Sequence, residues 1–208
     1  MPKPRASSSD RPRRGPRPTN QRSDVRDAAL TLFAEHGYRS TGVRDIANAL
    51  GIGTTSVYSH ISSKAELLHE IVLSTLDAAL DIQADAIASS SDVVEQLRRV
   101  AESQVRYFTR LPREAIVTTR EFRWAEGPDL AEILAKRQTY RHRIERLLER
   151  GQREGRFAAG NTKIAAFAII EMYEAVPKWF RAGDELSDTE IAYLYGEYAA
   201  RVAGATGS

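Results

Sequence analysis

Apolar residues recur with the period of an α-helix from Ser23 almost to the end of this 208-residue chain. Apolar side chains three and four positions apart share one face of a helix, whereas a half-buried strand needs strict alternation. No part of the sequence alternates in that way, and no internal repeat is visible. The sequence therefore predicts an all-α fold, with helices over residues 25–36, 41–50, 63–87, 92–109, 112–125, 128–153, 161–180 and 188–203.

Capping residues mark the starts of four of these helices. The capping-box spacing, a hydroxyl or carboxylate followed three residues later by glutamate, occurs at Ser63–Glu66, Asp92–Glu95 and Ser187–Glu190. Asn161 can cap the helix that follows it. Pro177 should kink or end that same helix, because proline removes an i→i−4 hydrogen bond.

A short stretch between two of the helices, GIGTTSVYSH at residues 51–60, is rich in poor helix formers. Two short helices joined by LGIG (residues 50–53) have the layout of a helix-turn-helix, in which Gly51 supplies the turn. The apolar residues would face its interior: Ile46, Leu50, Ile52, Val57 and Ile61. The outward residues would be Thr54, Thr55, Ser56, Tyr58, Ser59 and His60. Because such polar side chains contact base edges and phosphates, the pattern favours a DNA-reading surface over an edge strand or a polar loop.

Charge is unevenly distributed along a chain whose net charge is +2. Residues 1–22 hold seven lysines and arginines against one aspartate, a net +6, and five of the eight prolines. We interpret this segment as a disordered basic arm, since it has almost nothing apolar to bury. A basic arm on an otherwise acidic chain indicates a polyanionic partner, and a solubilising tail is the alternative.

Several classes of protein are excluded or disfavoured by composition. The chain contains no cysteine, which rules out disulfides, thiolate metal ligands and cysteine nucleophiles. Its longest apolar run, IAAFAII at residues 164–170, is too short to span a bilayer, and no apolar signal-peptide core follows the first basic residues. We therefore expect a cytoplasmic protein with no membrane partner.

No catalytic or metal-binding motif is visible. The four histidines are scattered at positions 36, 60, 69 and 142, and there is no glycine-rich phosphate loop. Glu171 and Glu174 lie one turn apart, so a catalytic carboxylate pair is conceivable, although such residues are more often polar edges of a helical bundle. We expect no enzymatic activity, no metal and no cofactor.

Residues 25–72 resemble the DNA-binding domain of the TetR family of one-component bacterial regulators. The resemblance is nearly gapless and includes FAEHGY, VRDIA, the turn glycine, VYSH and SK.ELL. It implies a three-helix DNA-binding domain at residues 23–70 and a helical ligand-binding and dimerisation domain at residues 71–208. The distal segments QREGRF (152–157) and AVPKWFRAGDELSDTEIAYLYGEY (175–198) resemble branches that sense acyl-CoA or related lipid degradation products.

The resemblance also implies which residues meet DNA. Thr41 and Arg44 would contact the backbone, with Arg44 also near a base, and Thr54 and Thr55 would face bases. Phosphates would be held by Ser56, Tyr58, His60 and Lys64, a solvated side chain being the alternative for Lys64. Three positions depart from the family: Gly53 replaces a capping serine, Thr54 a lysine and Ile61 a phenylalanine. The recognition helix would then be less basic than usual, which makes the arm more important.

The function that the resemblance implies is a homodimeric repressor, released from a palindromic double-stranded DNA operator by a small hydrophobic or anionic effector. A helical ligand-binding or scaffolding protein without DNA binding is the alternative. The expected effector residues are Tyr107, Arg120, Trp124, Tyr140, Met172, Tyr173 and Trp179. Arginines 120, 123, 137 and 141 would hold an anionic group or else pair with glutamates 121, 171 and 174, and the aromatics are otherwise core. Residues Ile191, Leu194, Tyr195, Gly196, Tyr198, Ala199 and Val202, with Phe167 and Ile170, would form a four-helix dimer interface or else an intramolecular core.

Overall fold

The computed structural model describes residues 21–181 and 183–205, and the regular secondary structure of these residues is helical. The predicted all-α fold is therefore confirmed. Most of the expected basic arm, residues 1–20, lies outside the described residues. The elements are α1 (Arg22–His36), α2 (Val43–Leu50), α3 (Thr54–Tyr58), α4 (Lys64–Ala88), α5 (Val93–Arg110), α6 (Pro112–Ile116), η1 (Val117–Glu121), η2 (Phe122–Trp124), α7 (Gly127–Arg153), α8 (Thr162–Glu174), α9 (Val176–Trp179) and α10 (Asp188–Val202).

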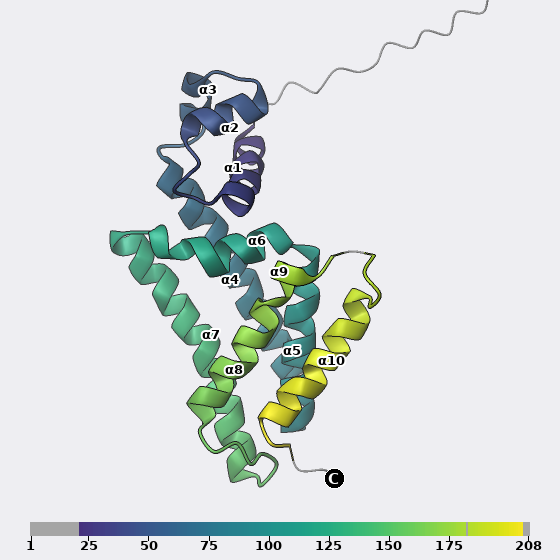
Figure 1. The fold of residues 1–208 in the computed structure, drawn as a ribbon. Helices are drawn as coiled ribbons and strands as arrows, with labels where there is room; N and C mark the ends of the chain where they lie inside the picture. The colour runs from purple at the N-terminus through teal and green to yellow at the C-terminus, as the bar shows by residue number, and fades with distance from the viewer. Residues whose placement is uncertain (1–20, 182, 206–208) are drawn as a thin grey trace, which may run out of the picture.

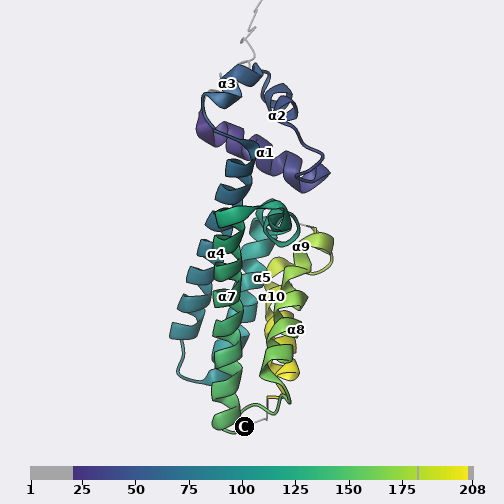
Figure 2. The same cartoon turned by 90° about the vertical axis from the view of Figure 1, so that its left-hand side faces the viewer.

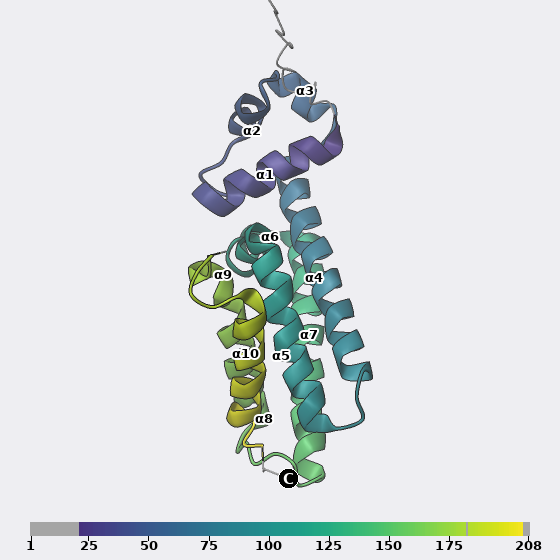
Figure 3. The same cartoon turned by 90° about the vertical axis from the view of Figure 1, so that its right-hand side faces the viewer.

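The molecule has a small head and a longer body (Figure 1). The head contains α1, α2 and α3, and α4 runs from it along the body beside α5 (Figure 3). The segment of α6, η1 and η2 crosses the top of the body, directly below the head (Figure 1). Helices α8 and α10 lie together on one side of the body, where α10 packs mainly on α5 (Figure 2).

The capping residues act as predicted. The Ser63 hydroxyl accepts from the Glu66 N–H at 3.1 Å, and one Asp92 carboxylate oxygen accepts from two backbone N–H groups at 2.9 Å each. Ser187 and Glu190 form a complete capping box at the start of α10. Pro177 lies in the first turn of α9, so the prediction that it interrupts the helix starting at Asn161 is confirmed.

The helix expected over residues 112–125 is present from Pro112 to Trp124, but it is α-helical only in its first five residues. Helix α6 ends at Ile116, and the next five residues form η1, a π-helical turn. Three consecutive β-branched residues, Val117, Thr118 and Thr119, are weak helix formers. The wider turn also directs Arg120 and Glu121 against α1, so tertiary contacts override the local helical pattern.

Two clusters of buried apolar side chains form the core. One joins α5, α7, α8 and α10 with the second half of α4. The other fills the head and the first half of α4, but it also includes Val117, Ala125 and Ile133 from the body. The head and the body therefore share a packed junction at η1, and a boundary at residue 70 stays a prediction.

Candidate DNA-binding surface and effector cavity

The turn between α2 and α3 has the conformation that the sequence predicts. Gly51 has φ of 66°, in the left-handed region where side chains are disfavoured, and its N–H donates to the Asn48 carbonyl at 3.1 Å. Ile46, Ala47 and Val57 are buried beneath the two helices. These buried side chains pack α2 and α3 together within the head, and α3 lies at the tip of the head (Figure 1).

The outer face of α3 carries the polar side chains expected to meet DNA. Thr54 and Thr55 are exposed, and Tyr58 is 55% exposed although it is a large aromatic residue. Ser56 and His60 are half-buried at the edges of this face, and Arg44 is exposed on the first turn of α2. These placements are compatible with the predicted DNA contacts, which stay predictions.

Thr41 does not lie on the outer face of the head. It is only 2% exposed, and its hydroxyl donates to the Gly37 carbonyl at 2.9 Å. Its side chain closes the loop between α1 and α2 from inside, because that loop packs against α1. The prediction that the Thr41 side chain contacts the DNA backbone is therefore wrong.

Lys64 also has an internal role. Its ammonium donates to the carbonyls of Tyr38 at 2.8 Å and Thr41 at 2.7 Å, and it lies 4.0 Å from the centroid of the Tyr38 ring. Burial lowers the pKa of this amine. The alternative of a solvated lysine is wrong. The phosphate contact stays a prediction, since one of the three ammonium protons is left for it.

Arg22 is a structural residue that sequence reasoning assigned to the arm. Its guanidinium donates to the His60 carbonyl at 2.6 Å, to Glu66 at 2.7 Å and to Glu70 at 2.5 Å. It therefore ties α1 to the end of the recognition unit and to α4. Hydrogen bonds from Ser62, followed by those from Arg22, lower the pKa of Glu66 to about 2.

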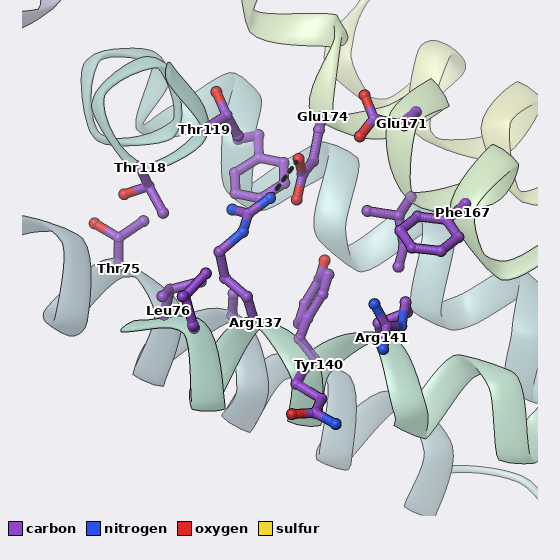
Figure 4. A pocket seen from close by; sticks show the side chains of 15 residues that line it. Thr75, Leu76, Thr118, Thr119, Arg137, Tyr140, Arg141, Phe167, Glu171 and Glu174 are labelled. Carbon is purple, nitrogen blue, oxygen red and sulfur yellow. Dashed lines mark ion pairs between the residues drawn. The ribbon is translucent and has the colours of Figure 1, made fainter. Parts of the chain in front are cut away.

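A cavity of about 350 Å³ lies in the body between α4, α5, α7, α8 and η1 (Figure 4). Its apolar lining consists of Leu76, Ala79, Phe108, Leu134, Phe167 and Ile170. Its polar lining consists of Thr75, Thr118, Thr119, Arg137, Gln138, Tyr140, Arg141, Glu171 and Glu174. Leu134, Gln138, Phe167 and Glu171 are exposed and form the mouth, whereas Phe108, Thr118, Tyr140 and Ile170 are buried at the inner end.

The charges of this lining are balanced. Arg137 pairs with Glu174, with 3.7 Å between nitrogen and oxygen, and its guanidinium lies 4.4 Å from the Phe122 ring centroid. Burial raises the pKa of Glu174. Arg141 lies 5.0 Å from the Phe167 ring centroid, toward the mouth (Figure 4). The alternative in which Arg137 pairs with a glutamate is therefore confirmed.

Most of the expected effector residues lie outside this cavity. Tyr140 lines it, and Tyr173 is buried behind Tyr140, with 6.4 Å between the ring centroids. Met172 and Tyr107 pack against the core. The remaining three are elsewhere: Trp124 stacks under Arg39, Trp179 is half-exposed beside Phe180, and Arg120 contacts α1. The prediction that these seven residues share one pocket is wrong, because helical spacing identifies a face but not the helix that covers it.

Arg120 and Glu121, which we call the η1 clasp, join the body to the head. Arg120 donates to the carbonyls of Phe33 at 3.2 Å and Ala34 at 2.9 Å, in the last turn of α1. Glu121 is buried and accepts from the Tyr38 N–H at 3.0 Å, and it also pairs with Arg120. The Phe33 carbonyl also accepts from the Gly37 N–H, whereas the Ala34 carbonyl lies beyond this last backbone hydrogen bond of α1, so the clasp completes the end of the helix.

A helix-turn-helix head above a helical body with an internal cavity defines a DNA-binding regulator with an effector domain. Residues 25–71 match the family model described as bacterial regulatory proteins of the tetR family. Residues 90–203 match the model of the tetracyclin repressor-like C-terminal domain. The chain belongs to the TetR family, which consists of transcriptional regulators and not of enzymes. In the part of the chain that the structure describes, no helix is long and apolar enough to cross a membrane.

Similar proteins cover nearly the whole chain. The HTH-type transcriptional repressor KstR2 of Rhodococcus jostii (strain RHA1) is 28% identical over 180 residues, which are 85% of this chain and 88% of that protein. The structure of the ketosteroid transcriptional regulator KstR2 of Mycobacterium tuberculosis has a TM-score of 0.82 at 25% identity, covering 92% of this chain and 100% of that one. AibR, solved in complex with isovaleryl coenzyme A and operator DNA, shares the fold, with a TM-score of 0.78 at 22% identity over 89% of this chain and 99% of that one.

Proposed function

We propose that this protein is a repressor that binds a two-fold symmetric operator as a homodimer and leaves it when a hydrophobic CoA thioester occupies the cavity. The single observation that carries the DNA-binding part is the exposed polar face of α3, held at the tip of the head by the Gly51 turn. Half-sites would lie about 34–36 Å apart, one turn of DNA. The basic arm would increase the affinity for DNA through electrostatic attraction to the phosphates.

The effector class is supported by the relatives and by the size of the cavity. KstR2 of Mycobacterium tuberculosis is described as a ketosteroid transcriptional regulator, and AibR shows that the fold can hold a CoA thioester. A volume of about 350 Å³ accommodates an acyl group but not coenzyme A as well. The acyl group would therefore enter the cavity, and the phosphates of the CoA part would remain outside the mouth.

The set of α10 residues proposed for the dimer interface differs from the set expected from the sequence. Ile191, Gly196 and Ala199 are buried within the subunit, and a Cβ at Gly196 would meet the Glu102 side chain at 2.9 Å. These residues allow α10 to approach α5 rather than a second subunit. The exposed apolar residues Tyr198 and Val202 lie on α10, which packs beside α8, and α8 exposes Ile164. A second copy of the chain would cover this face and complete a four-helix interface.

We expect Tyr198→Arg to give monomers, because it places a charge in the centre of the proposed face. Tyr193→Arg is the matched control, since Tyr193 is also exposed on α10 but lies about 140° around the helix from Tyr198. Sedimentation velocity measures both. Dimers of Tyr198→Arg that are as stable as those of the wild type would contradict this assignment.

The η1 turn offers a route from the cavity to the DNA. Thr118 and Thr119 line the cavity, and the two residues that follow form the η1 clasp on α1. An effector releases DNA only if it binds better to a head orientation that does not fit the operator. We propose that an occupied cavity shifts η1, and that the clasp moves the head with it.

The experiment that tests the proposed function is effector-dependent release of the operator. A CoA thioester should bind the protein and lower its affinity for operator DNA. A protein that binds the thioester but no DNA would instead be the ligand-binding or scaffolding alternative.

A further inference from the structure

Two hydroxyl groups that line the effector cavity are buried and have no hydrogen-bond partner of ordinary geometry among the described residues. They belong to Thr118, which is 3% exposed, and Tyr140, which is 4% exposed. The other threonine hydroxyls of the cavity are satisfied: Thr75 donates to the Ile71 carbonyl at 2.7 Å and Thr119 to the Ala115 carbonyl at 2.8 Å. Buried polar groups are nearly always paired in folded proteins, so unpaired hydroxyls that face a cavity indicate a partner that enters it.

The Tyr140 side chain is held in position from behind. Its ring packs edge to face on Tyr173, which is fully buried, and its backbone carbonyl accepts from the Gln83 side chain at 3.1 Å. The Tyr173 hydroxyl is buried beside it, close enough for the two phenols to interact with each other, and a pair of phenols that shares one hydrogen bond still has one O–H donor left for a third group. Burial raises the pKa of both phenols well above 10, so at neutral pH they stay neutral donors. Figure 4 shows Tyr140 and Thr118 facing the cavity from α7 and η1, respectively.

The arginines at the cavity do not provide free positive charge at its inner end. Arg137 is paired with Glu174, and Arg141 lies over Phe167 toward the mouth, where its Nε is buried without a partner among the described residues. A carboxylate at the inner end would meet Glu174 and two neutral hydroxyls. A carbonyl or alcohol oxygen would instead accept hydrogen bonds without bringing charge into a buried space.

We infer that the cavity selects an effector whose buried part is uncharged and carries carbonyl or hydroxyl oxygens, which the hydroxyls of Thr118 and Tyr140 bind. This inference rests on the proposed function, because it takes the cavity as the effector site. A plain hydrocarbon acyl group of the same size fills the volume but offers neither hydroxyl an acceptor. The site therefore discriminates by oxygen as well as by shape.

The test compares two probes that differ by one oxygen, cyclohexanecarbonyl-CoA and 4-oxocyclohexanecarbonyl-CoA. Isothermal titration calorimetry of the full-length protein should show tighter binding of the oxo probe, by about tenfold or more. Tyr140→Phe and Thr118→Val remove only hydroxyls, and at least one of them should lower this preference about tenfold. Thr119→Val is the matched control, because its hydroxyl lines the same cavity but is already bonded, so the preference should persist.

The outcomes separate the inference from the proposed function. Equal affinity of the wild type for the two probes, or an unchanged preference in both hydroxyl variants, would overturn the inference while leaving the effector class intact. Binding of neither probe would overturn the CoA-thioester effector. In that case the thermal unfolding midpoint of the ligand-free variants shows whether the two hydroxyls are paired inside the protein. An unchanged or higher midpoint for Tyr140→Phe and Thr118→Val supports unpaired groups, whereas a lower midpoint in both shows that they are paired inside the protein.

Discussion

Tyr58→Ala should weaken binding to every DNA sequence by a similar factor, about tenfold, because the phenol of an exposed tyrosine on α3 would donate to a phosphate rather than to a base. Thr55→Ala should instead change the preferred sequence, since Thr55 lies on the exposed face that would meet base edges. Neither side chain belongs to the buried core, so both variants should fold as the wild type does.

Fluorescence anisotropy on a panel of operator variants distinguishes the two effects. Tyr193→Ala is the matched control for Tyr58→Ala, because it truncates a tyrosine of similar exposure on α10, in the body. Wild-type affinity and sequence preference in both α3 variants would refute the assignment of α3 as the recognition helix.

Arg120→Ala should uncouple the effector from DNA while leaving effector binding intact. Arg120 contacts the carbonyls at the end of α1 and lies outside the cavity, so its removal breaks the arginine half of the clasp without changing the cavity lining. Coupling free energies between sites typically correspond to about 5–150-fold changes in affinity. We expect the effector-induced loss of DNA affinity to fall from this range to nearly none.

Arg123→Ala is the control for the clasp. Arg123 is an exposed arginine only three residues away, and its side chain donates to the Arg120 carbonyl within the same segment. The effector response of each variant is measured as the ratio of operator affinities with and without thioester. A full response in Arg120→Ala would show that the signal does not pass through the η1 clasp.

The fold could be predicted from the sequence wherever interactions between neighbouring residues determine it. The left-handed Gly51 turn and the capping residues Ser63, Asp92 and Ser187 act within a few residues of themselves. The η1 turn was not accessible, because Arg120 and Glu121 find their partners more than eighty residues away on α1 and in the loop that follows it. A periodic apolar pattern cannot report such contacts.

The sites were predicted unevenly for the same reason. Exposure on α3 follows from its polar side chains, whereas the burial of Thr41 depends on how the loop between α1 and α2 folds around Lys64. Aromatic content pointed to Trp124 and Trp179, which lie outside the cavity. The charged residues spaced one turn apart on α7 and α8 indicate the cavity better than the aromatic residues do. The cavity is lined by arginines 137 and 141 and by glutamates 171 and 174.

The central claim is that one protein binds an operator and releases it when its cavity is filled. Its most direct test is the anisotropy of a labelled DNA fragment from immediately upstream of the protein's own reading frame, titrated with protein in the absence and presence of 4-oxocyclohexanecarbonyl-CoA. We predict binding of the free protein, and a loss of affinity of about fivefold or more at saturating thioester. Binding of the thioester with no change in DNA affinity, or no binding of the DNA at all, would contradict the claim.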